Sequence, residues 1–252
     1  MSDLTLVVLY PELLGLYADR GNAVALRHRA ALRGISAEIV EIHAGETIPA
    51  AADFYLLGGA EDAAIATALG LLRDQATLGR AIGRGATVLG VCAGFQLLGH
   101  TLIGPDGEML AGLGHLDVES RPIPGDRAVG DVLATSPTLG ELQGFENHRG
   151  DARLGPDARP LATVVRGTGN GHGRSEGAVQ GNVVGTYLHG PALVRNPALA
   201  DMFLAEMTGH PLPPVVDEPV ERLRTERRDA LTRGRRWRDR LRPRLPSRLR
   251  QR

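Results

Sequence analysis

Short apolar runs alternate with helical patterns through the first 92 residues, and this alternation limits the fold more than any other feature. The first run, TLVVLY at 5–10, is continuously apolar, as expected for a strand that is buried on both faces of a sheet. The helical patterns end at Gly34 and Gly85, and glycine commonly terminates helices. We therefore expect βαβ units, and so a three-layer α/β fold with a mostly parallel central sheet and helices on both faces. The expected strands are 5–10, 37–42, 53–59 and 86–92, and the expected helices are 19–33 and 61–83.

The pattern changes after residue 113, where strand-like runs follow one another with few helical segments between them. This predicts extra strands or hairpins in the second half of the chain. One amphipathic helix is expected near its end, over 197–208. The strand-like runs are HLDVES, AVGDVLA, ATVVRG and NVVGTYLHG.

Charge is distributed unevenly along the chain, although the formal net charge is zero. Residues 222–252 hold 14 arginines against three acidic residues, a net charge of +11, and residues 1–221 carry −11. We expect one domain over residues 1–212, because a chain of this length with 42% hydrophobic residues can bury a sizeable core. Residues 213–252 then form a linker and an arginine-rich tail. The tail should be helical to about Arg242 at most, because Pro243 and Pro246 stop a helix.

Three interpretations of the tail stay open. It is a solvated extension, a segment drawn to the anionic cytoplasmic face of a membrane, or a segment that docks on the acidic domain or on a partner subunit. A nucleic-acid partner is not expected.

Several classes of protein are excluded by composition. No run reaches the ~20 apolar residues of a membrane-spanning helix, and no secretory leader is apparent, so we expect a cytoplasmic location, with the tail hypothesis allowing peripheral contact with the membrane. Cys92 is the single cysteine, which excludes internal disulfides and cysteine-cluster metal sites. We therefore expect no metal site. The chain has no lysine and no GxxxxGK[ST] loop for ATP.

Cys92 stands in the spacing G-x-C-x-G, between an expected strand and an expected helix. This spacing is typical of a nucleophile elbow, a sharp turn that holds its central side chain out of the sheet. The dipole and free N–H groups of a helix N-terminus also favour a thiolate. An isolated cysteine is more often an inert core residue, but the elbow spacing favours a nucleophile at Cys92.

Two further strand ends carry residues that fit such a nucleophile. The Gly58-Gly59 turn lets backbone N–H groups approach a ligand, so Gly59 together with Ala93 is the expected oxyanion hole. Most Gly-Gly turns are only turns, so this signal is weak alone. A cysteine nucleophile also needs a base. His189 follows the apolar run VVGTYL and precedes Gly190-Pro191, which makes it the best candidate among eight histidines.

Taken together, four motifs resemble the class I, triad-type glutamine amidotransferases of the cobyric-acid-synthase-like branch. They are the elbow CAGFQLLG, the strand that ends in GG, GFENHRG at 144–150 and GTYLHGP at 185–191. Within that branch the chain is similar to the GatD-type glutaminase subunits of lipid II isoglutaminyl synthases. The resemblance implies a glutamine amidotransferase fold, Cys92 as nucleophile, His189 as general base and Arg127 as the residue that binds L-glutamine. A guanidinium suits the glutamine α-carboxylate, although without the resemblance Arg127 is an ordinary surface arginine.

The chain departs from the wider class at one catalytic position. Many triad amidotransferases have a glutamate two residues after the histidine, and here that residue is Pro191. Either Cys92 and His189 act as a dyad, or an acid from elsewhere orients the imidazole. In the GFENHRG signature we expect Glu146 and His148 in a turn at a strand edge, and we assign them no catalytic step.

The resemblance also implies a partner. No cofactor is expected in this chain, and ATP and Mg²⁺ belong to a separate MurT-like subunit of the Mur-ligase family, in a heterodimer. That subunit would amidate the α-carboxyl of D-glutamate in the stem peptide of lipid II with ammonia from this chain, a step of peptidoglycan synthesis. Two alternatives stay open, an amidotransferase for a corrinoid-type carboxylate and a non-catalytic binding module of the same fold.

Overall fold

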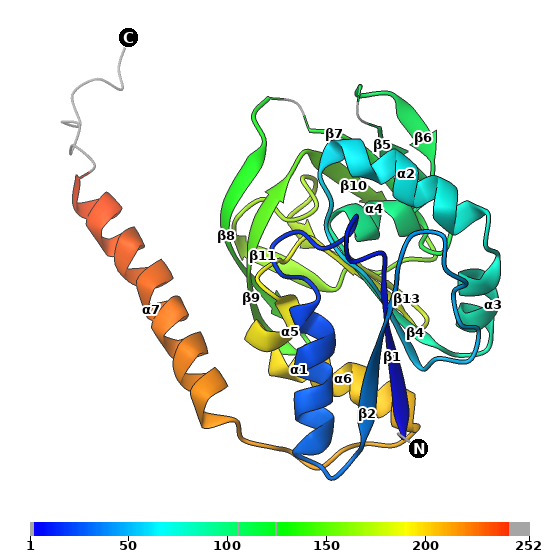
Figure 1. Cartoon of the computed structure of the whole chain (residues 1–252). Helices are drawn as coiled ribbons and strands as arrows, with labels where there is room; N and C mark the ends of the chain where they lie inside the picture. The colour runs from blue at the N-terminus through cyan, green and yellow to red at the C-terminus, as the bar shows by residue number, and fades with distance from the viewer. Residues whose placement is uncertain (1–2, 105, 124, 242–252) are drawn as a thin grey trace. The chain divides into compact units, whose positions relative to one another are not determined.

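The computed structural model describes residues 3–104, 106–123 and 125–241, and side chains of the last helix as far as residue 231 (Figure 1). The chain divides into two compact units, Met1–Val215 and Val216–Arg252. The first unit holds the central sheet and the candidate active site.

The central sheet has six strands in the order β13-β14-β4-β3-β1-β2. Neighbours from β14 to β2 pair in parallel, and β13 adds an antiparallel edge. The expected mostly parallel sheet is confirmed, and β3 and β4 are buried along their whole length, as their continuous apolar runs indicate. The bounds are β1 Leu4–Leu9, β2 Ala37–Ile42, β3 Phe54–Leu57, β4 Thr87–Val91, β13 Ala178–Gln180 and β14 Val183–Thr186.

Helices lie on both faces of this sheet (Figure 1). Three of them contact one another, namely α1 (Gly21–Ala31), α5 (Ala192–Arg195) and α6 (Pro197–Thr208), the last of which has the predicted bounds. In the second group, α2 (Asp62–Arg73) contacts α4 (Ala93–Leu98), and α3 (Thr77–Gly83) follows α2 in the chain. Phe54 of β3 packs edge-on against Phe203 of α6, with ring centroids 5.4 Å apart, so the core fills the space between sheet and helices.

The prediction of one helix over 61–83 was wrong, because the chain leaves the helix between α2 and α3. Gln75 lies in this break. Its side-chain oxygen accepts the Ile48 N–H at 2.8 Å, and its side-chain nitrogen donates to the Glu46 carbonyl at 2.8 Å. These tertiary contacts override local helical preference, which is a weak determinant on its own.

The second half adds two four-stranded sheets, ordered β10-β7-β5-β6 and β12-β11-β8-β9. The expectation of added strands and hairpins is confirmed. The bounds are β5 Thr101–Ile103, β6 Met109–Ala111, β7 Val118–Pro122, β8 Ala128–Ser136, β9 Gly140–His148, β10 Gly150–Leu154, β11 Ala162–Arg166 and β12 Ser175–Glu176.

The expected turn at Glu146 and His148 was wrong, because both residues belong to β9. They form the far end of the β8–β9 hairpin, where His148 pairs with Ala128 and Glu146 pairs with Gly130. The register of the hairpin is set by its turn and by the alternation of buried residues, so polar residues can be carried into the strand.

The second unit contains α7 (Glu218–Leu241). Its end at Leu241 agrees with the expected limit near Arg242, and the segment expected to be exposed beyond it lies outside the described residues. None of the helices in the described part of the chain combines the length and the apolar character needed to cross a bilayer.

Candidate active site

Cys92 lies at the junction of β4 and α4, at the carboxyl-end edge of the central sheet. Its φ of 52° and ψ of −102° fall outside the regions that non-glycine residues favour. Such conformations cost about 1–3 kcal/mol and persist only when the surrounding structure enforces them. Here the Cys92 N–H donates to the Thr186 carbonyl of β14 at 2.9 Å, which fixes the turn to the neighbouring strand. The sharp strand-to-helix turn that the spacing predicts is therefore formed at Cys92.

The glycines on either side of Cys92 permit this turn through their lack of a side chain. A Cβ atom at Gly90 would lie 2.7 Å from the Gly94 carbonyl oxygen, and one at Gly94 would lie 2.1 Å from the Leu57 carbonyl oxygen. Real Cβ atoms do not approach backbone so closely. The Gly94 N–H donates to the Gly58 carbonyl at 3.1 Å, so the elbow also contacts the end of β3.

His189 comes three residues after β14 and is 1% exposed. Its backbone pairs with Phe145 of β9 through two hydrogen bonds, of 3.2 and 2.8 Å, which hold the residue against the β8–β9 hairpin. The ring nitrogen Nε2 is buried and makes no hydrogen bond of normal geometry among the described residues. It is thus available to the sulfur and to a leaving group.

Asp19 supplies the acid that the sequence motif lacks. Its carboxylate oxygens lie 3.4 and 3.3 Å from His189 Nδ1, and Asp19 itself is fully buried. Of the two alternatives left open, a dyad or a distant acid, this geometry favours an acid from elsewhere in the chain. Sequence reasoning missed Asp19 because its partner lies 170 positions away, and the residue resembles an ordinary acidic residue near the start of a helix.

The pKa of His189 reflects these neighbours. Burial alone lowers the pKa of the imidazole, but interactions with Asp19 and with the Cys92 sulfur outweigh burial and raise it from 6.5 to about 10. The protonated ring is therefore favoured at neutral pH. Nucleophile, imidazole and carboxylate stand in the order required for a nucleophile, a general acid and base, and a group that orients the base.

The expected oxyanion role of Gly59 needs correction. The Gly59 N–H donates to Asp19 Oδ2 at 2.8 Å and so is already used to hold the carboxylate. A Cβ atom at Gly59 would lie 2.8 Å from His189 Cε1, which shows that glycine is needed here for the close approach of the imidazole. Ala93 stands where it was expected, at the first position of α4 directly after the nucleophile. Its N–H has no intrahelical acceptor, as at any helix start.

Arg127 precedes β8 and is brought to the same site. Its Nε donates to Asn147 Oδ1 at 2.5 Å, and the Asn147 carbonyl oxygen is 3.8 Å from the Cys92 sulfur. Arg127 Nη1 also lies 3.8 Å from Asp62 Oδ2 at the start of α2. Asn147 thus contacts both Arg127 and Cys92. This places the arginine close enough to Cys92 to bind the charged end of a substrate.

Glu146 and His148, on either side of Asn147 in β9, are buried. Glu146 accepts the N–H groups of Thr168 and Gly169, both at 2.8 Å, and so secures the glycine-rich loop that follows β11. The His148 ring stacks on Tyr187 with centroids 3.7 Å apart. These contacts give both residues a supporting function in the structure.

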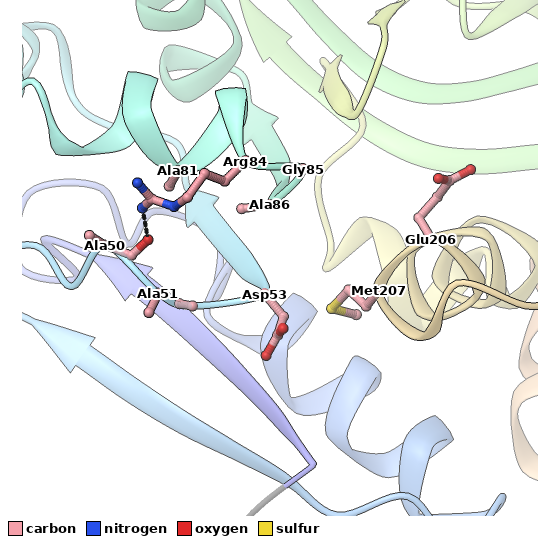
Figure 2. A pocket seen from close by; sticks show the side chains of 10 residues that line it. Ala50, Ala51, Asp53, Ala81, Arg84, Gly85, Ala86, Glu206 and Met207 are labelled. Carbon is pink, nitrogen blue, oxygen red and sulfur yellow. Dashed lines mark hydrogen bonds between the residues drawn. The ribbon is translucent and has the colours of Figure 1, made fainter.

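A pocket of about 370 Å³ lies at the opposite edge of the sheet, where β3 and β4 begin (Figure 2). Its lining includes an arginine that donates to the Ala50 carbonyl, two carboxylates and no cysteine or histidine, so it lacks the groups for nucleophilic catalysis. Among the described residues no group of three or more His, Cys, Asp or Glu side chains is placed to hold a metal ion. The pocket is lined by Ala50, Ala51, Ala52, Asp53, Ala81, Arg84, Gly85, Ala86, Glu206 and Met207.

Comparison with known proteins identifies relatives among the glutamine amidotransferases. The subunit GatD of the lipid II isoglutaminyl synthase (glutamine-hydrolyzing) from Staphylococcus aureus (strain N315) is 39% identical over 222 residues, which cover 85% of this chain and 89% of that protein. A cobyric acid synthase from Cereibacter sphaeroides is 38% identical over 161 residues, covering 59% of this chain and 31% of that protein. A crystal structure of a glutamine amidotransferase has a TM-score of 0.56 at 20% identity, over 81% of this chain and 99% of that one.

The family match covers most of the first unit, over residues 5–197, and includes Asp19, Cys92, Arg127 and His189. It describes the CobB/CobQ-like glutamine amidotransferase domain. With this family match and the similarity to GatD, the chain belongs to the family of CobB/CobQ-like glutamine amidotransferases and is a glutamine-hydrolysing enzyme of the GatD type.

Proposed function

We propose that this chain hydrolyses L-glutamine through a thioester on Cys92 and supplies the ammonia to a partner subunit. The observation that carries the proposal is the position of His189, whose Nδ1 lies 3.3 Å from the Asp19 carboxylate and whose pKa, despite burial, is raised by Asp19 and Cys92. Such a combination activates a thiol and provides a proton for a departing amine.

In the first half of the reaction the Cys92 sulfur attacks the carbon of the glutamine side-chain carboxamide. The negative charge on the oxygen is stabilised by the Ala93 N–H at the start of α4. The carbon–nitrogen bond then breaks as His189 transfers its proton to the nitrogen, which leaves as ammonia. In the second half His189 takes a proton from water, the resulting hydroxyl attacks the thioester, and glutamate departs while the thiol is restored.

For the acceptor we propose the α-carboxyl of D-glutamate in the stem peptide of lipid II. The support is the extent of the sequence similarity. The aligned region covers 89% of the GatD subunit from S. aureus, and that protein is named as a subunit of a larger synthase. A separate MurT-like subunit would bind ATP and Mg²⁺ and activate the carboxyl group. The complex would work at the inner face of the membrane, where the lipid-linked acceptor is held.

A corrinoid-type carboxylate is the second candidate acceptor, and the similarity to cobyric acid synthases favours it. However, this chain spans only 31% of such a protein, so the remainder of that enzyme would have to come from another polypeptide. A non-catalytic module is disfavoured by the strained cysteine and by the buried acid beside the histidine, since neither is needed for binding alone.

We also propose that the arginine-rich tail binds the complex to the membrane surface. Its +11 charge would draw the complex to anionic lipids, with about 1 kcal/mol per arginine near the surface, an attraction that weakens with salt. Truncation after Pro219 should leave glutaminase activity intact and reduce binding to anionic vesicles at low salt. Equal vesicle binding by both proteins would refute the membrane hypothesis, and loss of partner binding would favour docking instead.

The proposal as a whole is tested by measuring glutamate release from L-glutamine by the purified chain, with and without a MurT-like partner. Cys92→Ala is the negative control. Amidation is then measured with ATP and either lipid II or a corrinoid carboxylate as acceptor. Amidation of lipid II alone supports the proposal. Amidation of the corrinoid alone would show that the acceptor is a corrinoid carboxylate and not lipid II. Absence of glutamine hydrolysis under every condition would refute the proposed glutaminase activity.

A further inference from the structure

Three side chains form a hydrogen-bonded chain beside the catalytic pair. Asn147 stands in the middle: its Oδ1 accepts from Arg127 Nε at 2.5 Å, and its Nδ2 donates to the hydroxyl of Tyr17. The two ends come from distant parts of the chain, because Tyr17 follows β1 and Arg127 precedes β8. Nothing in the catalytic steps described above uses Asn147 or Tyr17.

Asn147 also contacts the nucleophile through its backbone. Its carbonyl oxygen lies 3.8 Å from the Cys92 sulfur, so a single residue touches both the nucleophile and the arginine. This fixes the separation between the group that reacts with the carboxamide and the group that binds the far end of the substrate. Distance between these groups is what orients a small amino acid for attack.

Tyr17 is held at the edge of the site by an unusual backbone. Tyr17 and Ala18 have φ values of 54° and 61°, so two consecutive non-glycine residues adopt the left-handed conformation immediately before Asp19. The Tyr17 ring packs edge-on against His189, with centroids 4.8 Å apart, and it also lies 6.0 Å from Phe145. Tyr17 is 41% exposed while His189 is 1% exposed, so the tyrosine contacts both the buried imidazole and solvent.

The bond to Asn147 also determines which nitrogens of Arg127 remain for a ligand. Because Nε is used, a carboxylate can bind in bidentate fashion only end-on, through the two terminal nitrogens. Asp62 lies 3.8 Å from one of them and is largely exposed. A free amino acid carries an ammonium group next to its carboxylate, so an acid at this position suits the same ligand.

We propose that Tyr17 and Asn147 are positioning residues for the substrate arginine, and that they hold Arg127 so that it binds the α-carboxylate of glutamine end-on at a fixed distance from Cys92. The inference rests on the proposed function, because it assigns Arg127 to glutamine. It predicts that loss of either hydrogen bond weakens glutamine binding and leaves the chemical step intact.

The test is steady-state glutaminase kinetics on the full chain with its partner, using Tyr17→Phe, Asn147→Ala, the double variant and Arg127→Ala. Tyr17→Phe removes only the hydroxyl, and Asn147→Ala keeps the backbone carbonyl near Cys92. A lost hydrogen bond changes binding by about 2- to 10-fold. We expect each single variant to raise KM by that factor with kcat within about twofold, and the double variant to match Asn147→Ala alone, because residues that act as one unit are not additive. Arg121→Ala, an exposed arginine on β7, is the matched control and should change neither constant.

The outcomes separate the inference from the proposed function. If Arg127→Ala leaves KM unchanged, the assignment of Arg127 to glutamine fails. If Arg127→Ala raises KM while Tyr17→Phe and Asn147→Ala do not, the positioning inference fails alone. Additive effects in the double variant, or a fall in kcat without a change in KM, would also overturn it. Thermal unfolding checks each variant, and Tyr17→Phe, which preserves shape, decides the test if Asn147→Ala does not fold.

Discussion

Replacing Asp19 by Asn tests the acid that sequence analysis did not find. The substitution keeps the size of the side chain, and its remaining carbonyl oxygen can still accept the Gly59 N–H that Asp19 Oδ2 accepts at 2.8 Å. It removes the negative charge beside His189. It also places an amide NH₂ near Nδ1, which favours a ring that carries its proton on Nε2 and cannot accept one from the Cys92 thiol.

The magnitude follows from the pKa of His189. Burial lowers this pKa, and interactions with Asp19 and Cys92 outweigh it and place the value at about 10 instead of 6.5. That difference corresponds to about 5 kcal/mol of preference for the protonated ring. Asp19 and Cys92 share this preference, so loss of Asp19 removes part of it, and each ~1.4 kcal/mol removed lowers the rate about tenfold. The change of tautomer adds to this, since the equivalent substitution in a serine hydrolase triad costs ~10⁴-fold. We therefore expect kcat for glutamine hydrolysis to fall by about 10²- to 10⁴-fold.

The assay is glutamate release from saturating L-glutamine, with Asp157→Asn as the matched control because Asp157 is an exposed carboxylate in the turn after β10. Unfolding by urea should show similar stability for both variants. A kcat within about threefold of the wild-type value in a folded Asp19→Asn protein would refute the argument and leave Cys92 and His189 as a dyad.

Three further predictions concern the elbow and a buried acid. Cys92→Gly should abolish glutamine hydrolysis yet be at least as stable to urea as Cys92→Ala, because glycine tolerates φ 52°; a less stable glycine variant would contradict the strain argument. Gly94→Ala should lower the free energy of unfolding by about 1–3 kcal/mol or more, since its Cβ would lie 2.1 Å from the Leu57 carbonyl oxygen, whereas Gly83→Ala, which meets nothing within 4 Å, should be nearly neutral. Burial raises the pKa of Glu176 from 4.5 to about 7, against the lowering effect of hydrogen bonds from Thr186 and Tyr187. Between pH 4.5 and 7 Glu176 therefore keeps its proton in the folded protein but has lost it in the unfolded chain. The free energy of unfolding should fall by roughly 3 kcal/mol as the pH rises through this range. Glu176→Gln should remove this slope in unfolding measured at pH 5 and 7.5, and an unchanged slope would contradict it.

The parts of the fold that sequence analysis predicts best are those governed by local pattern. Hydrophobic periodicity is a local signal, so β2 and α6 are found with the expected bounds. The break between α2 and α3 depends instead on the side chain of Gln75 reaching backbone 27 and 29 positions away, and local propensity contains no information about such contacts.

The candidate site divides in the same way. Cys92 is marked by the spacing of its glycines, and His189 by its place after an apolar run, because both signals are local. Asp19 has no local signal that distinguishes it from other acids near helix starts. The correction at Gly59 has the same origin: its N–H was expected to be free, but the fold brings a buried carboxylate to it from 40 positions away.

The central claim is that glutamine is hydrolysed through a thioester on Cys92, and a trapped intermediate tests it most directly. The chain and its partner are mixed with excess L-glutamine, quenched in acid within the first turnovers, digested and analysed by mass spectrometry. We predict a mass increase of one glutamyl group on the peptide that contains Cys92, its loss on treatment with hydroxylamine, and its absence in Cys92→Ala. Glutamyl label on another residue, or continued ammonia release by Cys92→Ala, would contradict the account.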